Sequence, residues 1–301
     1  MTTQTKSLAT GLPTTHPAEE RTSPRGARLS LRRDAGLLIP GAFAVLLLAV
    51  AVAAPLLAPY DPAAGSLTDR LLDPGAPGHV LGTDGQGRDV LSRLIHAARP
   101  SLIGGIGPVV VATTSGTALG IAAGLGSRVI EQALLRSLDV LYAFPGILLA
   151  IAVATVLQPG LGATVLSLSI VLTPAVTRVT HTEVRRIRSS EYLEAARVSG
   201  ASGTAIATRQ VLPVVAPVVL AYASSLVGLS IVYAAGLSFL GLGAAPPTAE
   251  WGAMLDELRP SLLTHPWVAV LPAVTILVVS VIFNALGESL RRQVGIREDR
   301  R

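Results

Sequence analysis

Cysteine is missing from this 301-residue chain, and Lys6 is its sole lysine. The lack of cysteine excludes disulfides, thiolate metal sites and cysteine nucleophiles. A Walker A motif is excluded as well, because that motif needs a lysine after a glycine-rich loop to hold the nucleotide phosphates. Any work driven by ATP must therefore come from another chain.

Charge is also scarce, at 14% of residues, against about 25% in soluble domains. Half of the residues are hydrophobic, and the mean hydropathy is +0.58. This composition predicts an all-α polytopic membrane protein, so the net charge of +5 is interpreted as a topology signal rather than as a sign of nucleic-acid binding. Residues 1–34 are rich in Thr, Pro and Arg and do not resemble a signal peptide. They are predicted to form a disordered cytoplasmic tail.

Charge-free tracts predict the membrane spans, because a central charge costs about 2.5–3.5 kcal/mol. Residues 35–60 and 100–127 are each long enough for one helix. Residues 140–177 are too long for one, and Gln158-Pro159-Gly160 predicts a turn that divides them into two spans. Residues 210–249 are predicted to cross once, with 237–247 left at the outer boundary, and the last span falls within 260–287. The prediction is six transmembrane helices.

The basic residues orient this arrangement. With both termini in the cytoplasm, 19 of the 24 Lys and Arg residues lie inside and 5 outside, as the positive-inside rule requires. Charges within the spans are nearly absent. An ion-coupled secondary transporter usually carries ionisable groups near the midplane, so that class is disfavoured. A membrane-embedded assembly factor with no cargo stays open.

Gly116, Gly120 and Gly124 recur at every fourth residue of the second span. Small residues at this spacing let helix backbones approach closely in lipid. The pattern predicts a packing seam within this subunit, and the alternative is a seam against a second subunit.

A polar, arginine-bearing stretch, residues 189–213, separates two of the predicted spans. Ser190 is suited to cap a first helix, Gly200 to end it, and Ser202 to cap a second helix that runs through Leu212. Ala195 and Ala196 leave a low surface on which a partner could close. The alternative is an ordinary interfacial loop whose arginines face lipid headgroups.

The sequence Glu194-Ala195-Ala196, followed by Gly200 and Leu212-Pro213, resembles the EAA loop of ABC importer permeases, with Gln210 where the family pattern has isoleucine. Residues 81–93 (LGTDGQGRDVLSR), 237–252 (LSFLGLG, PP, EWG) and 283–288 (FNALGE) resemble further signatures of the dipeptide/oligopeptide/nickel permeases. The resemblance covers residues 35–297.

The resemblance implies a type I ABC importer permease fold with both termini inside. Its expected parts are the tail 1–34, a first helix and extracytoplasmic loop 35–100, a permease domain 101–290 with a coupling loop 179–212, and a tail 291–301. The expected partners are a second permease subunit, two ATP-binding subunits that hold ATP and Mg, and an extracytoplasmic solute-binding protein. This chain would be a multi-pass subunit of the bacterial cytoplasmic membrane, with no enzymatic activity, cofactor or metal of its own. It would import di- or oligopeptides, or alternatively nickel or another small solute.

Two sets of residues are the candidate sites. The resemblance implies that the first set couples the permease to the ATPase; it comprises Glu191, Glu194, Ala195, Ala196, Arg197 and Gly200. The second set would form a hydrogen-bonded polar cluster at the outer membrane surface; it comprises Thr83, Asp84, Gly87, Arg88 and Asp89. A structural role for the second set is preferred over contact with cargo, because polar loops at a surface most often satisfy backbone groups. The cargo-binding residues are not identified by the sequence.

Overall fold

The computed structural model describes residues 25–298, with side-chain environments for residues 37–293. Contacts divide the chain into two units, residues 1–35 and 36–301. The elements in chain order are α1 (Arg25–Leu57), η1 (Leu67–Asp69), α2 (Val90–Leu125), α3 (Arg128–Tyr142), α4 (Gly146–Val156), α5 (Leu161–Ile187), α6 (Glu191–Val198), α7 (Gly203–Ala205), η2 (Ile206–Val211), α8 (Leu212–Phe239), α9 (Trp251–Leu258), η3 (Arg259–Leu263) and α10 (Pro266–Glu298).

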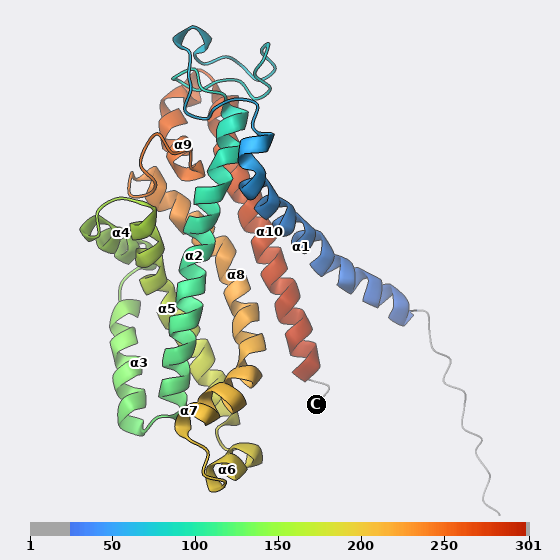
Figure 1. Ribbon diagram of the computed structural model, residues 1–301, viewed down its shortest axis with the longest axis vertical. Helices are drawn as coiled ribbons and strands as arrows, with labels where there is room; N and C mark the ends of the chain where they lie inside the picture. The colour runs from blue at the N-terminus through green and yellow to red at the C-terminus, as the bar shows by residue number, and fades with distance from the viewer. Residues whose placement is uncertain (1–24, 299–301) are drawn as a thin grey trace, which may run out of the picture. The chain divides into compact units, whose positions relative to one another are not determined.

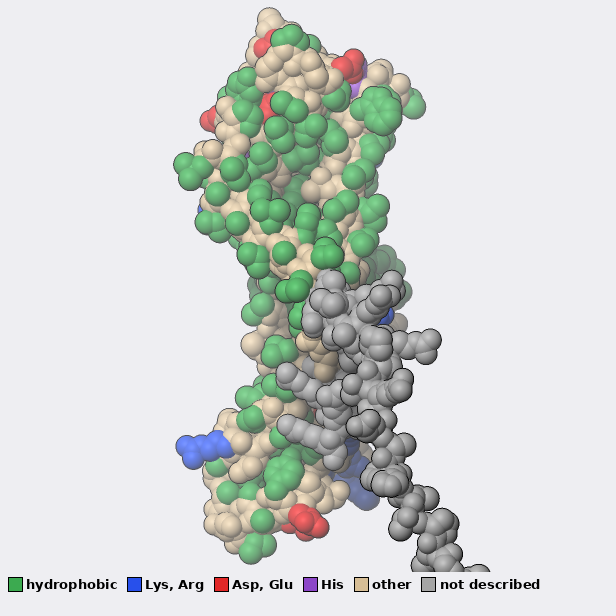
Figure 2. All heavy atoms as spheres, turned by 90° about the vertical axis from the view of Figure 1, so that its right-hand side faces the viewer, with side chains coloured by type: hydrophobic (Ala, Val, Ile, Leu, Met, Phe, Trp, Pro, Cys, Tyr) green, Lys and Arg blue, Asp and Glu red, His purple; other side chains and the backbone are tan. Residues whose placement is uncertain are grey.

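Among the described residues, five helices are long and apolar enough to cross a membrane, and a sixth span results if the bent pair α3 and α4 counts as one. Figure 2 shows hydrophobic side chains over much of the face that it presents, with charged side chains mainly toward the two ends. The predicted all-α membrane architecture is confirmed. Its orientation in the bilayer stays a prediction.

The third span differs from the prediction of a single helix that begins near residue 140. Instead, α3 begins at Arg128, ends at Tyr142, and is followed by α4 at an angle of 91°. Pro145 causes the break, because a proline disfavours helical backbone at the preceding residue and lacks an N–H of its own. The short α4 would extend for only about 16 Å, so it does not cross a bilayer by itself.

The other predicted breaks agree with the structure. Between α4 and α5, Gln158 has a φ of 72° and Gly160 one of 159°, which makes the turn. The tract 210–249 contains one long helix, α8, which ends at Phe239 and leaves 240–249 outside it. Residues 25–34 belong to α1, so the predicted disordered tail is wrong for them, since Ala, Leu and Arg in this stretch favour helix. Residues 1–24 lie outside the described part of the chain.

The core of the second unit is made by α2, α5, α8 and α10, in which α2 packs on α5 and α8, and α10 packs on α8 (Figure 1). Gly116, Gly120 and Gly124 form the seam between α2 and α5. A Cβ atom built on Gly120 would lie 2.5 Å from the Cβ atom of Thr180, and one on Gly124 would lie 2.5 Å from Val184 Cγ1. The seam within this subunit is therefore confirmed, and its assignment to a subunit interface is wrong.

Candidate functional site

The polar stretch after α5 folds into a helix with a well-defined end. α6 begins after Ser190, although the Ser190 hydroxyl makes no cap hydrogen bond. At the other end Gly200 has a φ of +78°, its N–H donates to the carbonyl of Arg197, and the Ala201 N–H donates to that of Ala196. This pair of bonds is a Schellman motif. Gly200 therefore ends the helix for the predicted reason.

One face of α6 holds it on the protein and the other is free. Leu193 is fully buried in a cluster with residues of α2, α5, η2 and α8, and Ala196 packs against the same cluster. The remaining predicted coupling residues are exposed; they are Glu191, Glu194, Ala195, Arg197 and Gly200. Tyr192 and Val198 are also exposed. Each lies three residues from Ala195, and this helical spacing is the signal by which the sequence could have identified them. The exposed face offers small, apolar and charged groups to a partner.

The second predicted helix of the loop does not end before the next span. Ser202 caps α7, with its Oγ atom accepting from the Ala205 N–H at 3.3 Å. The chain continues through the widened π-helical turn η2 directly into α8. Pro213 accounts for the widening, because its ring clashes with the carbonyl four residues earlier and it has no N–H to donate. Residues 203–239 are thus continuous helical backbone from α7 through η2 to α8, and the turn at 199–202 connects α6 to it.

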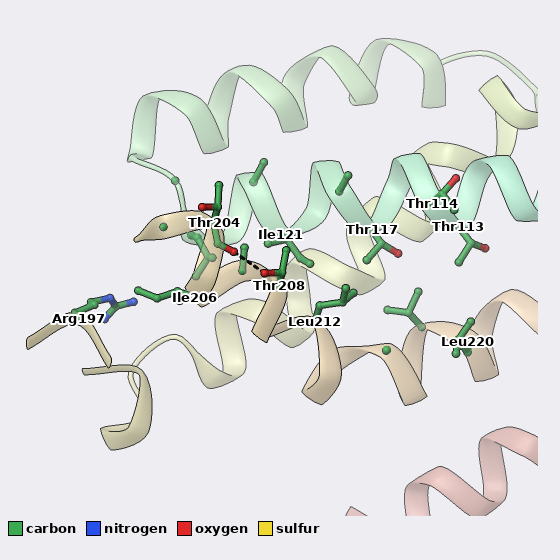
Figure 3. Close-up of a pocket in the computed structure, with 18 residues that line it drawn as sticks. Thr113, Thr114, Thr117, Ile121, Arg197, Thr204, Ile206, Thr208, Leu212 and Leu220 are labelled. Atoms are coloured by element: carbon green, nitrogen blue, oxygen red, sulfur yellow. Dashed lines mark hydrogen bonds between the residues drawn. The ribbon is translucent and has the colours of Figure 1, made fainter. Parts of the chain in front are cut away.

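An open groove of about 830 Å³ lies between α2 and the segment from α7 to α8 (Figure 3). Five threonines contribute hydroxyl-bearing side chains to its lining; they are Thr113, Thr114, Thr117, Thr204 and Thr208. Much of the rest is aliphatic, and Arg197 is the one charged side chain among the described residues that line it. Because Arg197 also belongs to α6, the groove and the candidate coupling helix are adjacent.

At the opposite end of α2, Asp84 is the centre of a buried polar network. Its Oδ1 atom accepts from the backbone N–H groups of Gln86 at 2.8 Å and of Arg88 at 3.0 Å. Its Oδ2 atom accepts from Arg88 Nε at 2.7 Å and Arg93 Nη1 at 2.5 Å. Burial alone would raise the pKa of Asp84, but these hydrogen bonds and the two arginine charges outweigh it and hold the pKa below its ordinary value of 3.8.

The other members of the predicted outer set lie beside this network in the same loop, where Thr83 and Asp89 form a backbone bridge. Asp89 caps α2, with its Oδ2 atom accepting from the Ser92 N–H at 2.8 Å. Thr83 donates its hydroxyl to the carbonyl of Asp69. Gly87 has a φ of +73°, and a Cβ atom there would collide with the Ser66 carbonyl. The structure thus brings all five residues together. The burial of their polar side chains favours a structural role over contact with cargo.

Sequence reasoning missed the residue that ties this network to α9. Glu257 Oε2 lies 2.5 Å from Arg88 Nη2 and 2.7 Å from Arg93 Nη1. Glu250 strengthens the same connection, because its Oε1 atom accepts from Ser101 Oγ of α2 at 2.9 Å. The separation of 169 residues between Arg88 and Glu257 leaves no local signal in the sequence.

Residues 116–296 match the family model described as "Binding-protein-dependent transport system inner membrane component". The chain is 41% identical over 251 residues to the "Glutathione transport system permease protein GsiD" of Pectobacterium atrosepticum, covering 83% of each chain. It is 37% identical over 286 residues to the protein of the same name from Shigella boydii, covering 95% of this chain and 94% of that one.

Among solved structures, the chain resembles one described as "Inward facing conformations of the MetNI methionine ABC transporter". The match has a TM-score of 0.56 at 15% identity and covers 67% of this chain and 96% of that one. This likeness concerns the fold alone.

Proposed function

This chain belongs to the family of binding-protein-dependent transport system inner membrane components, and from that premise we propose that it forms half of a path for short peptides. It is a permease subunit of an ABC importer and a multi-pass protein of the bacterial inner membrane. Its role is transport rather than bond chemistry. The family is confirmed as the one that the sequence motifs predicted.

The observation that carries the peptide proposal is the near full-length similarity to permeases named for glutathione, a peptide-like solute. The groove between α2 and α8 is compatible with it. Its volume of about 830 Å³ falls within the range of about 300–1,000 Å³ usual for small-molecule sites. The threonine hydroxyls can hydrogen-bond to peptide groups, while the aliphatic residues tolerate varied side chains.

Uptake by the reconstituted importer tests this cargo. We expect ATP-dependent accumulation of glutathione or of unmodified di- to tetrapeptides in proteoliposomes that contain the importer complex and its solute-binding protein. Competition between unlabelled peptides and the labelled one would establish a shared path. Accumulation of Ni²⁺ with no uptake of any peptide would refute the proposal and favour the alternative cargo.

The partners are expected to be a second permease subunit, two ATP-binding subunits and an extracytoplasmic solute-binding protein, with ATP and Mg held by the ATP-binding subunits. The support is membership of a family whose name requires a binding protein, and the absence of a Walker A motif in this chain. The exposed face of α6 is the proposed docking site for an ATP-binding subunit. Its small Ala195 leaves room for a partner groove to close over the helix.

Replacing Ala195 by arginine tests the docking site. The side chain is exposed, so α6 should fold normally while the added bulk keeps the partner away. We expect ATP-dependent uptake to fall at least tenfold, with fewer ATP-binding subunits co-purifying; a tenfold loss corresponds to about 1.4 kcal/mol of lost association. The matched control is Ala133→Arg, at an exposed position of α3. Equal uptake and equal co-purification in the two variants would refute docking on α6.

A further inference from the structure

A polar pocket of about 390 Å³ lies between α3 and α5 and shares no lining residue with the groove. It is lined by Arg128, Glu131, Gln132, Leu135, Arg136 and Arg185. Five of these residues are on α3 at spacings of three, four, seven and eight from the first, which places them on one helix face. The sixth comes from α5, so the pocket follows the seam between the two helices.

The pocket carries an excess of positive charge. Glu131 is its one acidic lining residue among those described, and it is already engaged. Its Oε1 atom is 2.9 Å from His181 Nε2, and its Oε2 atom is 3.6 Å from Arg185 Nη1. Arg128 and Arg136 are exposed and make no ion pair within the part of the chain that the structure describes. Two guanidinium groups are therefore available to an anion.

The position of the pocket relative to the membrane follows from the charges on α5. Residues 161–177 of that helix carry no charge, and at 1.5 Å per residue they span about 26 Å, close to the hydrocarbon thickness of about 30 Å. Arg178 is the first charged residue after them, and its Nη2 atom lies 2.5 Å from Asp139 Oδ1 of α3. This ion pair marks the inner edge of the hydrocarbon. Arg185 lies about 10 Å further along α5.

In the predicted orientation, Arg136 lies about 5 Å and Arg128 about 16 Å along α3 on the cytoplasmic side of Asp139. The polar headgroup layer occupies about 5–8 Å beyond the hydrocarbon on each side, which the long side chains of Arg136 and Arg185 can reach. Val129 and Ile130, on the same helix, are exposed apolar residues. A molecule at this place would therefore meet arginines beside an exposed apolar surface.

We propose that this pocket binds the phosphate headgroup of an anionic phospholipid from the inner leaflet. Guanidinium groups bind phosphate oxygens through paired N–H donors, and basic pockets between helices on the cytoplasmic side of a membrane are suited to anionic headgroups. The lipid would lie across the α3–α5 seam. It would add to the ion pairs that Asp139 and Glu131 of α3 make with α5. The bend at Pro145 separates α3 from α4.

Native mass spectrometry of the full chain in its detergent-purified, delipidated complex tests the proposal. The complex is titrated separately with dioleoyl phosphatidylglycerol and dioleoyl phosphatidylcholine. We expect the first bound lipid to appear at a lower concentration of phosphatidylglycerol than of phosphatidylcholine. Arg136→Gln should weaken phosphatidylglycerol binding about fivefold, Arg128→Gln, which lies further from the hydrocarbon, should weaken it less, and both should leave phosphatidylcholine binding unchanged. The size is the equivalent of about 1 kcal/mol for one arginine near a charged surface.

The matched control is Arg292→Gln, at an exposed cytoplasmic-end arginine of α10 outside the pocket, which should keep the parental preference. Neither Arg128 nor Arg136 makes an ion pair within the described structure, and both are exposed, so both variants should fold. Lipid binding by the variants equal to the parent would overturn the proposal. So would equal competition by inorganic phosphate, which would indicate a soluble anion, or loss of the ATP-binding subunits with lipid preference unchanged, which would indicate a protein contact.

Discussion

Replacing Asp84 by asparagine is the sharpest test of how the outer end of the permease is held together. Asparagine keeps the shape of the side chain but removes its charge, and it puts an NH₂ group near two guanidinium donors if the amide nitrogen takes the Oδ2 position. Arg93 is fully buried, and the side chain of Arg88 is only 6% exposed. Neither arginine can turn to water to replace the lost carboxylate.

The magnitude follows from this burial. Breaking one partner of a buried ion pair costs about 3–5 kcal/mol, because the remaining charge is left without compensation. Glu257 still contacts both arginines, so the lower end, about 3 kcal/mol, is expected for Asp84→Asn. For a chain of this size that corresponds to a decrease in melting temperature of roughly 6–12 °C.

The assay is thermal unfolding of the detergent-purified complex, combined with limited proteolysis between residues 58 and 89. The loop should be cleaved faster in the variant, because Asp84 connects that loop to α2 and, through the arginines, to α9. Asp73→Asn is the matched control, since Asp73 is exposed on the same loop. If the two variants melt within about 0.5 kcal/mol of each other, the usual range for surface substitutions, the buried network does not hold the loop and the reasoning is refuted.

Two further predictions concern packing and pH. Gly120→Leu should destabilise the α2–α5 seam by about 3 kcal/mol or more, because even a Cβ atom would lie 2.5 Å from that of Thr180. The control in the same melting assay is Gly162→Leu, where nothing lies within 4 Å of the Cβ position. Equal melting temperatures of the two variants would contradict the close approach of α2 and α5. Because the folded-state pKa of Asp84 is lowered, its stabilisation should be complete above about pH 4 and be lost as the pH falls through the lowered folded-state value. Melting curves from pH 7 downward should show this loss in the parent and a smaller one in Asp84→Asn, and identical pH profiles would count against it.

Local rules explain why so much of the architecture could be read from the chain. Charge-free tracts located the spans, and Gln158-Pro159-Gly160 located the turn before α5, because both signals act over a few residues. Gly200 ended α6 as predicted, since a left-handed residue is needed at that point whatever the helix packs against. The bend at Pro145 was also encoded locally. A proline within a span can kink its helix, but the angle of 91° between α3 and α4 has no counterpart in the linear pattern.

The sequence by itself determined that this is a multi-spanning α-helical permease of an ATP-driven importer, because hydrophobic length and a small set of linear motifs are sufficient for that conclusion. Only the tertiary structure decided which distant residues meet. Three contacts depend on how the helices pack. Glu257 meets Arg88 and Arg93, the glycine seam closes on α5 rather than on another subunit, and Arg136 and Arg185 line the same pocket. Such contacts arise from three-dimensional burial and charge pairing between segments far apart in the chain, for which no local pattern exists.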